Sequence, residues 1–446
     1  KNLSSGPKTI EGLKIVSPLD HRLHDGRGAH LPILQEIGDG LTTIAWDSWV
    51  AIHPSTMQKL GLKRNQVIRI SSGVSSIEVS CYPLVGIHKD LLVVPRGNGH
   101  QDESSLISKG IGVNPLSLYP KDFDPISLEP VTSGVDVKIS KTDKWHVLAR
   151  MQKQNETLGR HDIIKTYTIN ELKKRTDGFD LDDVPDLFPK LEQGQYRWGM
   201  SVDIDSCNGC GACMVACSLE NNIPQAGRDQ VMLGRQMHWI RLDRYFSGDS
   251  QNPQVTFQPV MCQHCNHAPC EAVCPVYATT HDPEGINSMT YNRCVGTRYC
   301  ANACPYKVRR FNWWTHAWGE IGKREQDRNP RALNPDVTVR TRGVMEKCTF
   351  CLQRIKEVTH THKVKQTKLR DGEIKTACQQ TCPTNAITFG NLKDSDSQIS
   401  INRKDKRSYL MLGGDPEHKH YGLKTLPNVN YLAKVTHGSH SKGEHH

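Results

Sequence analysis

The stretch Cys207-Asn-Gly-Cys210-Gly-Ala-Cys213-Met-Val-Ala-Cys217 decides the fold of this chain, because runs related to its C-x2-C-x2-C-x3-C spacing recur along the sequence. Three more runs of this kind follow. They are Cys262, Cys265, Cys270 and Cys274 before Pro275; Cys294, Thr297, Cys300 and Cys304 before Pro305; and Cys348, Cys351, Cys378 and Cys382 before Pro383, the last with an insertion. Fifteen of the sixteen cysteines belong to these four runs. Such runs hold the clusters of bacterial ferredoxins, so the sequence predicts an iron–sulfur protein.

The spacing also predicts how the runs share their clusters. Three closely spaced cysteines wrap one loop around a cluster, so that backbone N–H groups can point at the sulfurs. The fourth cysteine begins a helix that runs to the neighbouring cluster and ligates that cluster instead. We pair the two outer runs with each other and the two inner runs with each other. The expected ligands are Cys207, Cys210, Cys213 and Cys382 for cluster one; Cys262, Cys265, Cys270 and Cys304 for cluster two; Cys274, Cys294 and Cys300 for cluster three; and Cys217, Cys348, Cys351 and Cys378 for cluster four.

The third run has a threonine, Thr297, where the other three runs have their second cysteine. A threonine cannot supply a thiolate, so cluster three is expected to lack one iron. The sequence therefore predicts three 4Fe–4S clusters and one 3Fe–4S cluster.

Other uses of cysteine fit this pattern less well. Zinc sites use C-x2-C pairs but have no need of a C-x3-C-P ending. Disulfide frameworks suit short secreted chains, whereas this chain has 446 residues and its cysteines are concentrated in one half. Covalent haem is not expected, because the pair Cys262-Gln-His-Cys265 is followed by Asn266. Cys81 lies alone in an apolar segment and is expected to be a buried, inert thiol.

The net charge of +10 raises the question of nucleic-acid binding. Four oxidised clusters with their thiolates contribute roughly −8, which nearly cancels this charge. The basic groups near the cysteine runs, Lys307, Arg309, Arg310, Arg340 and Arg342, are therefore expected to offset cluster charge or to dock a partner. We expect no nucleic-acid partner.

The ends and the hydropathy of the chain give two further expectations. No run of 18 or more apolar residues occurs, so this stretch is not expected to span a membrane. The sequence starts at Lys1, without methionine, a twin-arginine pair or an apolar signal segment. We expect it to be the C-terminal part of a longer chain rather than a secreted chain whose signal was removed.

The composition along the chain predicts an α+β protein. Short β-branched segments at 66–71, 76–80, 91–95 and 135–139, with a helix at 54–61, predict a small β-barrel-like domain. The expected segments are an extended arm (1–30), this barrel (31–140), a linker (141–195), a four-cluster ferredoxin-like domain (196–395) and a polar tail (396–446) that ends in His437, His440, His445 and His446.

Two sets of motifs resemble known families. The ferredoxin region resembles the four-cluster electron-transfer subunits of the molybdopterin oxidoreductase superfamily, such as those of dimethyl sulfoxide and polysulfide reductases. The motifs are Tyr196-Arg-Trp-Gly-Met-Ser-Val-Asp203, Gly234-Arg-Gln-Met-His-Trp-Ile-Arg-Leu-Asp-Arg244 and Tyr291-Asn-Arg-Cys-Val-Gly-Thr-Arg-Tyr-Cys300. The first domain resembles the molybdopterin-dinucleotide-binding domain, a double-psi β-barrel. Its motifs are Leu34-Gln-Glu-Ile, Thr43-Ile-Ala-Trp46, Leu60-Gly-Leu62 and Pro95-Arg-Gly-Asn-Gly99.

The two domains in this order resemble the large iron–sulfur subunit of alternative complex III, a bacterial quinol-oxidising complex. The resemblance implies a vestigial barrel without molybdopterin, a polytopic quinol-binding membrane subunit, haem c subunits and a terminal oxidase as partners. It also implies a peripheral place on the periplasmic face of the inner membrane. Electrons would pass from quinol through the clusters to haem c or another acceptor, and this chain shows no substrate active site of its own. The alternative is the electron-transfer part of a molybdenum-dependent reductase of the polysulfide or dimethyl sulfoxide type.

The cluster count can be measured directly. Three 4Fe–4S clusters and one 3Fe–4S cluster give about 15 irons and about 16 acid-labile sulfides per chain. Chemical analysis of the loaded protein, with electron paramagnetic resonance (EPR) of its oxidised form, tests this number. Sixteen irons without a three-iron signal would contradict the interpretation of Thr297.

Overall fold

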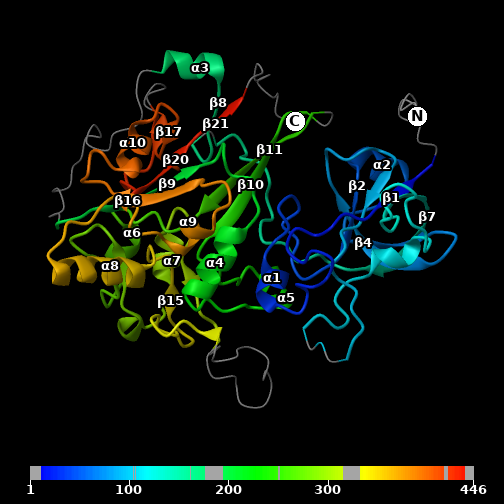
Figure 1. Ribbon diagram of the computed structural model, residues 1–446, viewed down its shortest axis with the longest axis horizontal. Helices are drawn as coiled ribbons and strands as arrows, with labels where there is room; N and C mark the ends of the chain where they lie inside the picture. The colour runs from blue at the N-terminus through cyan, green and yellow to red at the C-terminus, as the bar shows by residue number, and fades with distance from the viewer. Residues whose placement is uncertain are drawn as a thin grey trace. The chain divides into compact units, whose positions relative to one another are not determined.

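The computed structural model describes residues 12–103, 105, 107–160, 162–175, 194–249, 252–314, 332–415 and 420–436 (Figure 1). The chain divides into two compact units. The first is Lys1–Lys153 with Ala226–Gly234 and Gly248–Pro253; the second is Gln154–Gln225, Arg235–Ser247 and Gln254–His446. Each unit is described by itself below.

The first unit is built on a mixed seven-stranded sheet in the order β6-β1-β5-β2-β4-β3-β7. The strands are β1 (Lys14–Val16), β2 (Trp49–Ile52), β3 (Gln66–Ser71), β4 (Ser76–Pro83), β5 (Leu91–Val93), β6 (Ser133–Asp136) and β7 (Lys138–Trp145). The helices are α1 (Pro32–Glu36), α2 (Pro54–Lys59), α5 (Arg228–Met232) and the 3-10 turn η1 (Pro115–Leu118). The strands expected at 66–71 and 76–80 are confirmed, and the strand expected at 91–95 and the helix expected at 54–61 are present but end at Val93 and Lys59. The strand expected at 135–139 is divided between β6 and β7. The double-psi topology stays a prediction.

The core of this unit consists of the alternating apolar residues of its central strands. Ile52, Ile68, Ile70 and Leu92 are fully buried in one cluster. Cys81 lies in the same cluster, and burial raises the pKa of its thiol to about 12. The expectation that Cys81 is a buried, inert thiol is therefore confirmed.

Two expected boundaries of this unit differ from the structure. The segment 1–30 was expected to be an arm, but β1 pairs parallel with β5 and antiparallel with β6. The linker was expected to begin at 141, but β7 continues to Trp145 as the partner of β3. Both strands lack a clear alternation in sequence, because β1 has three residues and β7 has no buried position.

The second unit contains a four-stranded sheet in the order β16-β9-β20-β17. Its strands, labelled in Figure 1, are β9 (Trp198–Asp203), β16 (Ile387–Asn391), β17 (Ser408–Tyr409) and β20 (Val429–Leu432). Two-stranded sheets surround it: β10 (Arg241–Ser247) with β11 (Gln254–Val260), β12 (Thr279–His281) with β13 (Asn287–Met289), β14 (Arg310–Phe311) with β15 (Met345–Glu346), β18 (Gly414–Asp415) with β19 (His420–Tyr421), and β8 (Thr166–Thr168) with β21 (Lys434–Thr436).

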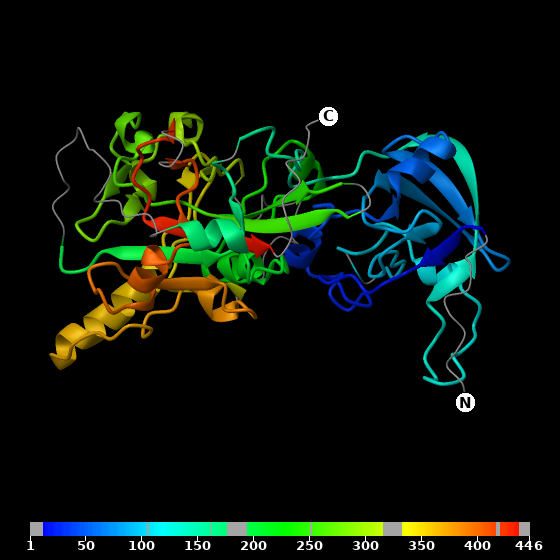
Figure 2. The ribbon, with the colours of Figure 1, turned by 90° about the horizontal axis from the view of Figure 1, so that it is seen from above.

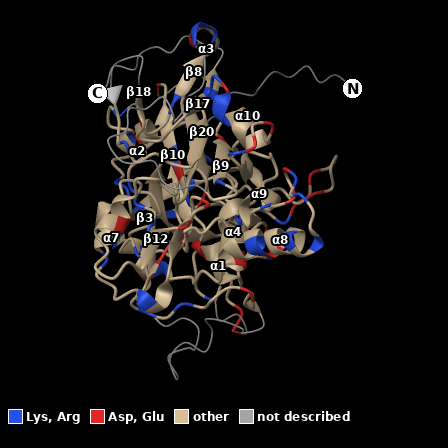
Figure 3. Ribbon diagram, turned by 90° about the vertical axis from the view of Figure 1, so that its left-hand side faces the viewer, with Lys and Arg blue, Asp and Glu red and all other residues tan. Residues whose placement is uncertain are grey.

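Most helices of the second unit are short and adjoin the cysteine runs. They are α4 (Ala212–Glu220), α6 (Pro269–Ala272), α7 (Tyr299–Ala303), α8 (Leu352–Lys365), α9 (Ala377–Thr381), α3 (Ile169–Lys174), α10 (Gln398–Lys404) and the 3-10 turn η2 (Tyr291–Arg293). The insertion in the fourth run forms α8, which buries only Ile355 and extends beyond its neighbours in Figure 2. Lysines and arginines mark its surface in Figure 3. No helix in the described ranges is long and apolar enough to cross a membrane.

The expected polar tail, 396–446, differs most from the structure. Within it, β20 is fully buried and pairs parallel with β9 in the middle of the sheet. The strand β20 has the short sequence Val-Asn-Tyr-Leu and is flanked by polar residues, so the average composition of the long segment did not predict it. His437, His440, His445 and His446 lie outside the described residues.

A buried ion pair joins the segments around the fourth run. The guanidinium of Arg340 contacts the Glu346 carboxylate at 2.7 Å, and both side chains are at most 1% exposed. Arg340 also donates to the carbonyl of Asn221 at 2.7 Å, and Glu346 accepts from Asn312 at 2.9 Å. A buried charge without its partner carries its full desolvation cost.

Arg340→Met should therefore lower the free energy of unfolding of the second unit by about 3–5 kcal/mol. Arg342→Met removes the same group from an exposed position two residues along, and should change it by no more than about 0.5 kcal/mol. Urea denaturation of both variants, followed by circular dichroism, measures the difference. Equal losses would contradict a special role for the buried pair.

Candidate metal centres

Strand pairing brings the runs together two by two. The strand before the first run, β9, pairs antiparallel with β16, which follows the fourth run. The strand after the second run, β12, pairs antiparallel with β13, which precedes the third run. The outer runs and the inner runs are therefore neighbours across the fold. This arrangement accords with the pairing that the sequence predicts.

All four runs share one backbone feature. The residue just before the second ligand position has a left-handed conformation in each, with φ of 74° at Gly209, 44° at His264, 74° at Gly296 and 55° at Phe350. At Gly296 a Cβ would lie 2.4 Å from the carbonyl oxygen of Gly343, so only glycine fits there. Thr297 follows Gly296 as Cys210 follows Gly209. The threonine thus occupies the second position of a loop shaped like the first.

A second repeated feature follows the cysteine–proline junctions. Tyr277, Lys307 and Asn385, each three residues after the fourth cysteine, have φ of 49°, 54° and 53°. The turn aims backbone N–H groups at sulfur: Ala278 donates to Cys274 Sγ at 3.2 Å and Ala386 to Cys382 Sγ at 3.3 Å. The expectation concerned the loops of closely spaced cysteines, where the Phe350 amide donates to Cys348 Sγ at 3.5 Å. The donors that follow the fourth cysteine were not expected.

The expected helix direction at these junctions is wrong. Cys304 and Cys382 were expected to begin a helix, but they end α7 and α9, with ψ of 114° at both. The proline that follows each cysteine disfavours the helical conformation of the residue before it. The short helix therefore carries the chain from the third cysteine to the fourth.

The first group of thiols contains cysteines from the first and fourth runs. Burial is the main cause that raises the pKa of Cys207 to about 11, and the backbone N–H of Gly209 opposes it, while Cys382 and Cys210 add to the rise. Burial also raises the pKa of Cys213, whose charged neighbours are Cys378 of the second group and Cys207, Cys210 and Cys382. These four thiols lie within electrostatic reach of one another.

A second group joins the same two runs at their other ends. Burial raises the pKa of Cys217 well above its usual range, with Cys348, Cys351 and Cys378 as the nearest charged neighbours. The side-chain amide of Asn221 spans part of this group. Its Nδ2 lies 3.7 Å from Cys217 Sγ and 4.0 Å from Cys351 Sγ.

The third group combines the second run with the end of the third. Burial raises the pKa of Cys265 well above its usual range, and its neighbours are Cys262, Cys304 and Cys270. Burial raises the pKa of Cys270 to about 12, whereas the nearby Arg309 lowers it. Arg309 Nη1 donates to Cys270 Sγ at 3.1 Å.

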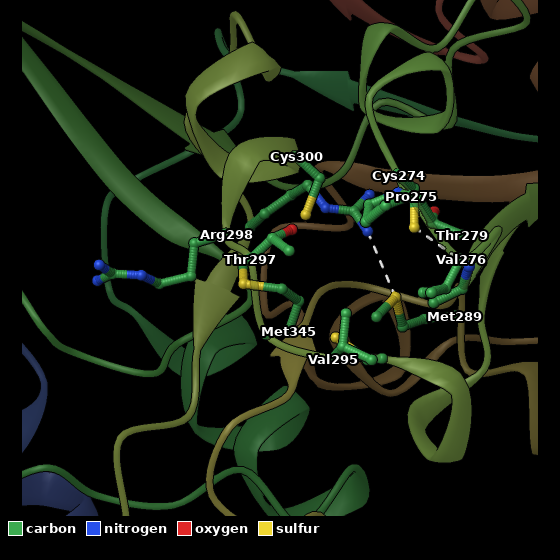
Figure 4. Close-up of a pocket in the computed structure, with 14 residues that line it drawn as sticks. Cys274, Pro275, Val276, Thr279, Met289, Val295, Thr297, Arg298, Cys300 and Met345 are labelled. Atoms are coloured by element: carbon green, nitrogen blue, oxygen red, sulfur yellow. Dashed lines mark hydrogen bonds between the residues drawn. The ribbon is translucent and has the colours of Figure 1, made fainter.

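The fourth group lines a small cavity (Figure 4). Cys274, Cys294, Thr297 and Cys300 all contribute to its wall. Cys294 and Cys274 are also neighbours of the Cys300 thiol, whose pKa burial raises. Burial raises the pKa of Cys274 as well, but backbone N–H groups outweigh it and bring that pKa below its usual value.

The chemistry of these groups suits iron–sulfur clusters. All sixteen cysteines lie in the described residues and none forms a disulfide. Burial raises the pKa of several thiols in these groups, so their thiolate forms need a nearby cation to replace the proton. Cluster irons do this, because ligation deprotonates cysteine. Soft thiolate sets are the ligands that iron–sulfur clusters require.

Sequence reasoning singled out the basic residues near the runs but missed how deeply some of them are buried. Lys347 is completely buried, and its Nζ donates to the carbonyl oxygens of Asn287 and Cys348. Arg309 is 6% exposed. His264, between Cys262 and Cys265, is stacked on Phe350 with ring centroids 3.8 Å apart. The lysines and arginines next to the cysteine–proline junctions were visible in the sequence, but their burial could not be predicted because it depends on the tertiary fold.

Comparisons with known proteins agree with this chemistry. Two families described as 4Fe-4S dicluster domains match residues 206–278 and 253–337. The chain is 39% identical over 250 residues to the iron–sulfur cluster-binding subunit of menaquinone reductase from Nitratidesulfovibrio vulgaris, covering 55% of this chain and 91% of that protein. It is 37% identical over 244 residues to a putative dimethyl sulfoxide reductase iron–sulfur protein of Halobacterium salinarum, covering 53% of this chain and 84% of that protein.

A third relative is an iron–sulfur subunit of an Hdr-like menaquinol oxidoreductase from Archaeoglobus fulgidus, 35% identical over 230 residues, which cover 48% of this chain and 77% of that protein. Among solved structures, acetylene hydratase from Pelobacter acetylenicus matches with 19% identity and a TM-score of 0.24. The match covers 29% of this chain and only 18% of that chain, and it carries no argument about the fold.

Proposed function

The chain belongs to the iron–sulfur subunits of molybdopterin oxidoreductase-type complexes, and from this premise we propose how it carries electrons. It transfers electrons through iron–sulfur clusters of the 4Fe–4S type. In our proposal it is a relay: electrons enter from quinol oxidised in a membrane partner and leave to haem c or another acceptor. Two relatives have menaquinone or menaquinol in their names, which supports a quinone-linked role.

The observation that carries this proposal is the fourfold repeat of one loop. Each loop has a left-handed residue before its second ligand position, and the thiols gather in four groups. We assign one cluster to each group. The ligands are Cys207, Cys210, Cys213 and Cys382 for cluster one; Cys262, Cys265, Cys270 and Cys304 for cluster two; Cys274, Cys294 and Cys300 for cluster three; and Cys217, Cys348, Cys351 and Cys378 for cluster four.

Cluster three is proposed to be the 3Fe–4S cluster, and the other three to be 4Fe–4S clusters. Thr297 supports this assignment, because it lines the cavity at the position where Cys210 stands in the first loop. The cavity opens between Cys274, Cys294 and Cys300, which supply three thiolates. A three-iron cluster needs no fourth.

The wider assembly is proposed from the resemblance to alternative complex III. The partners would be a polytopic quinol-binding subunit, haem c subunits and a terminal oxidase, on the periplasmic face of the inner membrane. The first unit would be a double-psi barrel without bound molybdopterin. The name of the Halobacterium relative favours one alternative, the electron-transfer part of a molybdenum-dependent reductase. Molybdenum in the purified complex would decide for that alternative.

One experiment tests the relay. EPR spectra of the intact complex are recorded oxidised, after addition of quinol, and after addition of a strong chemical reductant. The proposal expects quinol to reduce clusters that are oxidised in the resting complex. Clusters that respond only to the chemical reductant would contradict it.

The crossed ligation predicts where damage appears when one cysteine is replaced. Cys382→Ser should disturb the cluster held by Cys207, Cys210 and Cys213, since Cys382 lies among those thiols. The cluster of Cys348, Cys351 and Cys378 should keep its spectrum. Cys81 lies outside the four cysteine runs, so Cys81→Ser is the matched control and should retain every cluster. Damage confined to the fourth-run cluster would refute the crossing.

Thr297→Cys tests the three-iron assignment. The new thiolate completes the set, so a fourth iron should bind and the three-iron EPR signal should disappear. An added thiolate favours the oxidised state, so the potential of this cluster should fall. Quinol should then reduce it slowly, while a strong reductant still fills all four clusters. Unchanged quinol oxidation in a variant shown to hold the fourth iron would remove this cluster from the route.

A further inference from the structure

Arg309 is a buried cation that lies between the third and fourth groups of thiols. Its Nη1 donates to Cys270 Sγ at 3.1 Å, and its side chain lines the cavity of the fourth group together with Cys300. Cys270 belongs to the proposed ligands of cluster two and Cys300 to those of cluster three. One side chain, 6% exposed, therefore contacts a sulfur of one set and lines the cavity formed by the other.

The other contacts of Arg309 are neutral. Its Nη1 donates to Asn287 Oδ1 at 3.3 Å, and its Nη2 lies 3.4 Å from Met289 Sδ, the contact drawn as a dashed line in Figure 4. Its Nε is buried and has no hydrogen-bond partner within the described ranges. No Asp or Glu among the residues that the structure describes forms an ion pair with it. The charges that do face it are those of Cys270, Cys300, Cys262 and Cys304.

A buried guanidinium is retained only where opposite charge offsets its desolvation. Here that charge comes from thiolates and the clusters they hold. The attraction grows when a cluster gains an electron, because the cluster becomes more negative. A cation and an N–H···S bond at this point therefore favour the reduced state of the cluster beside them.

We propose that Arg309 sets the reduction potentials of clusters two and three together, holding both above the values they would have without its charge. This proposal rests on the proposed clusters. Since one guanidinium lies beside both ligand sets, it stabilises the electron on either side of the step between them. Arg309 acts as a positioning residue through its charge and takes no part in ligation.

Arg298 provides a matched control. It lines the same cavity, but its side chain points away from the cysteines in Figure 4. Its guanidinium lies over the rings of Phe311 and Trp313, 5.1 and 4.6 Å from their centroids. Arg298→Gln removes the same charge from the wall of the same cavity without removing a contact to sulfur.

The test is an EPR-monitored redox titration of the full chain with its clusters loaded, for the native protein, Arg309→Gln, Arg309→Lys and Arg298→Gln. In Arg309→Gln the reduction equilibria of clusters two and three should shift about tenfold toward the oxidised state, which is about 59 mV for a one-electron couple. Arg309→Lys should shift these equilibria less, because lysine keeps the positive charge but lacks the planar guanidinium with its several N–H donors. Clusters one and four, and all clusters of Arg298→Gln, should keep their potentials. The shift should persist in high salt, because the charge is buried.

Several outcomes would overturn the proposal. One is Arg309→Gln with full iron and four unchanged potentials, and another is an equal shift in Arg298→Gln. If Arg309→Gln loses clusters, Arg309→Lys decides: a shift confined to clusters two and three supports the proposal, and unchanged potentials refute it. Iron analysis of the native protein separates this result from the proposed function, since a native chain without clusters would defeat the assignment of the ligands themselves.

Discussion

Each cluster loop must turn its sulfurs inward while its backbone N–H groups remain free to face them. That requirement fixes a left-handed residue at the same place in all four runs. Glycine provides it at Gly209 and Gly296, whereas His264 and Phe350 adopt the same conformation at a steric cost. Those two rings stack on each other, so part of the cost is offset by packing in the centre of the unit. The strands and short helices of the second unit serve to bring these four turns together.

Buried charge is the second constraint. The thiols of the four cysteine runs are largely buried, and the clusters proposed for them carry net negative charge. Within the described residues, some cations beside these thiols have no carboxylate of their own, above all Arg309, and Lys347 donates to carbonyl oxygens. The buried carboxylates Asp243 and Glu346 each have their own arginine, Arg241 and Arg340. Part of the positive charge of the chain is thus buried in the second unit, beside the thiols proposed as cluster ligands.

The sequence was most informative where chemistry depends on spacing. The pairing of outer with outer and inner with inner runs followed from the C-x2-C-x2-C-x3-C pattern, and strand pairing brings those runs together. It was least informative where one short segment is decided by distant partners. The strand Val429–Leu432 fits between β9 and β17 although its surroundings are polar, and β1 joins a sheet from within an expected arm. The helices were expected to follow Cys304 and Cys382 but precede them, because the proline after each cysteine disfavours a helical conformation of that cysteine.

Thr297 and Arg309 act in the same direction at the third site. In the proposed assignment cluster three keeps only three thiolates, because Thr297 cannot supply a fourth, and the buried guanidinium of Arg309 lines the same cavity as Cys300. Both features are proposed to favour the reduced state, and they are independent, since one lies in the ligand set and the other in the surroundings. Arg309 also contacts Cys270, so the second cluster shares part of this effect while keeping four thiolates. Cluster three should therefore have the highest reduction potential of the four, and cluster two should have the next highest. That order suits a cluster that accepts the first electron from a quinol and passes it to its neighbour.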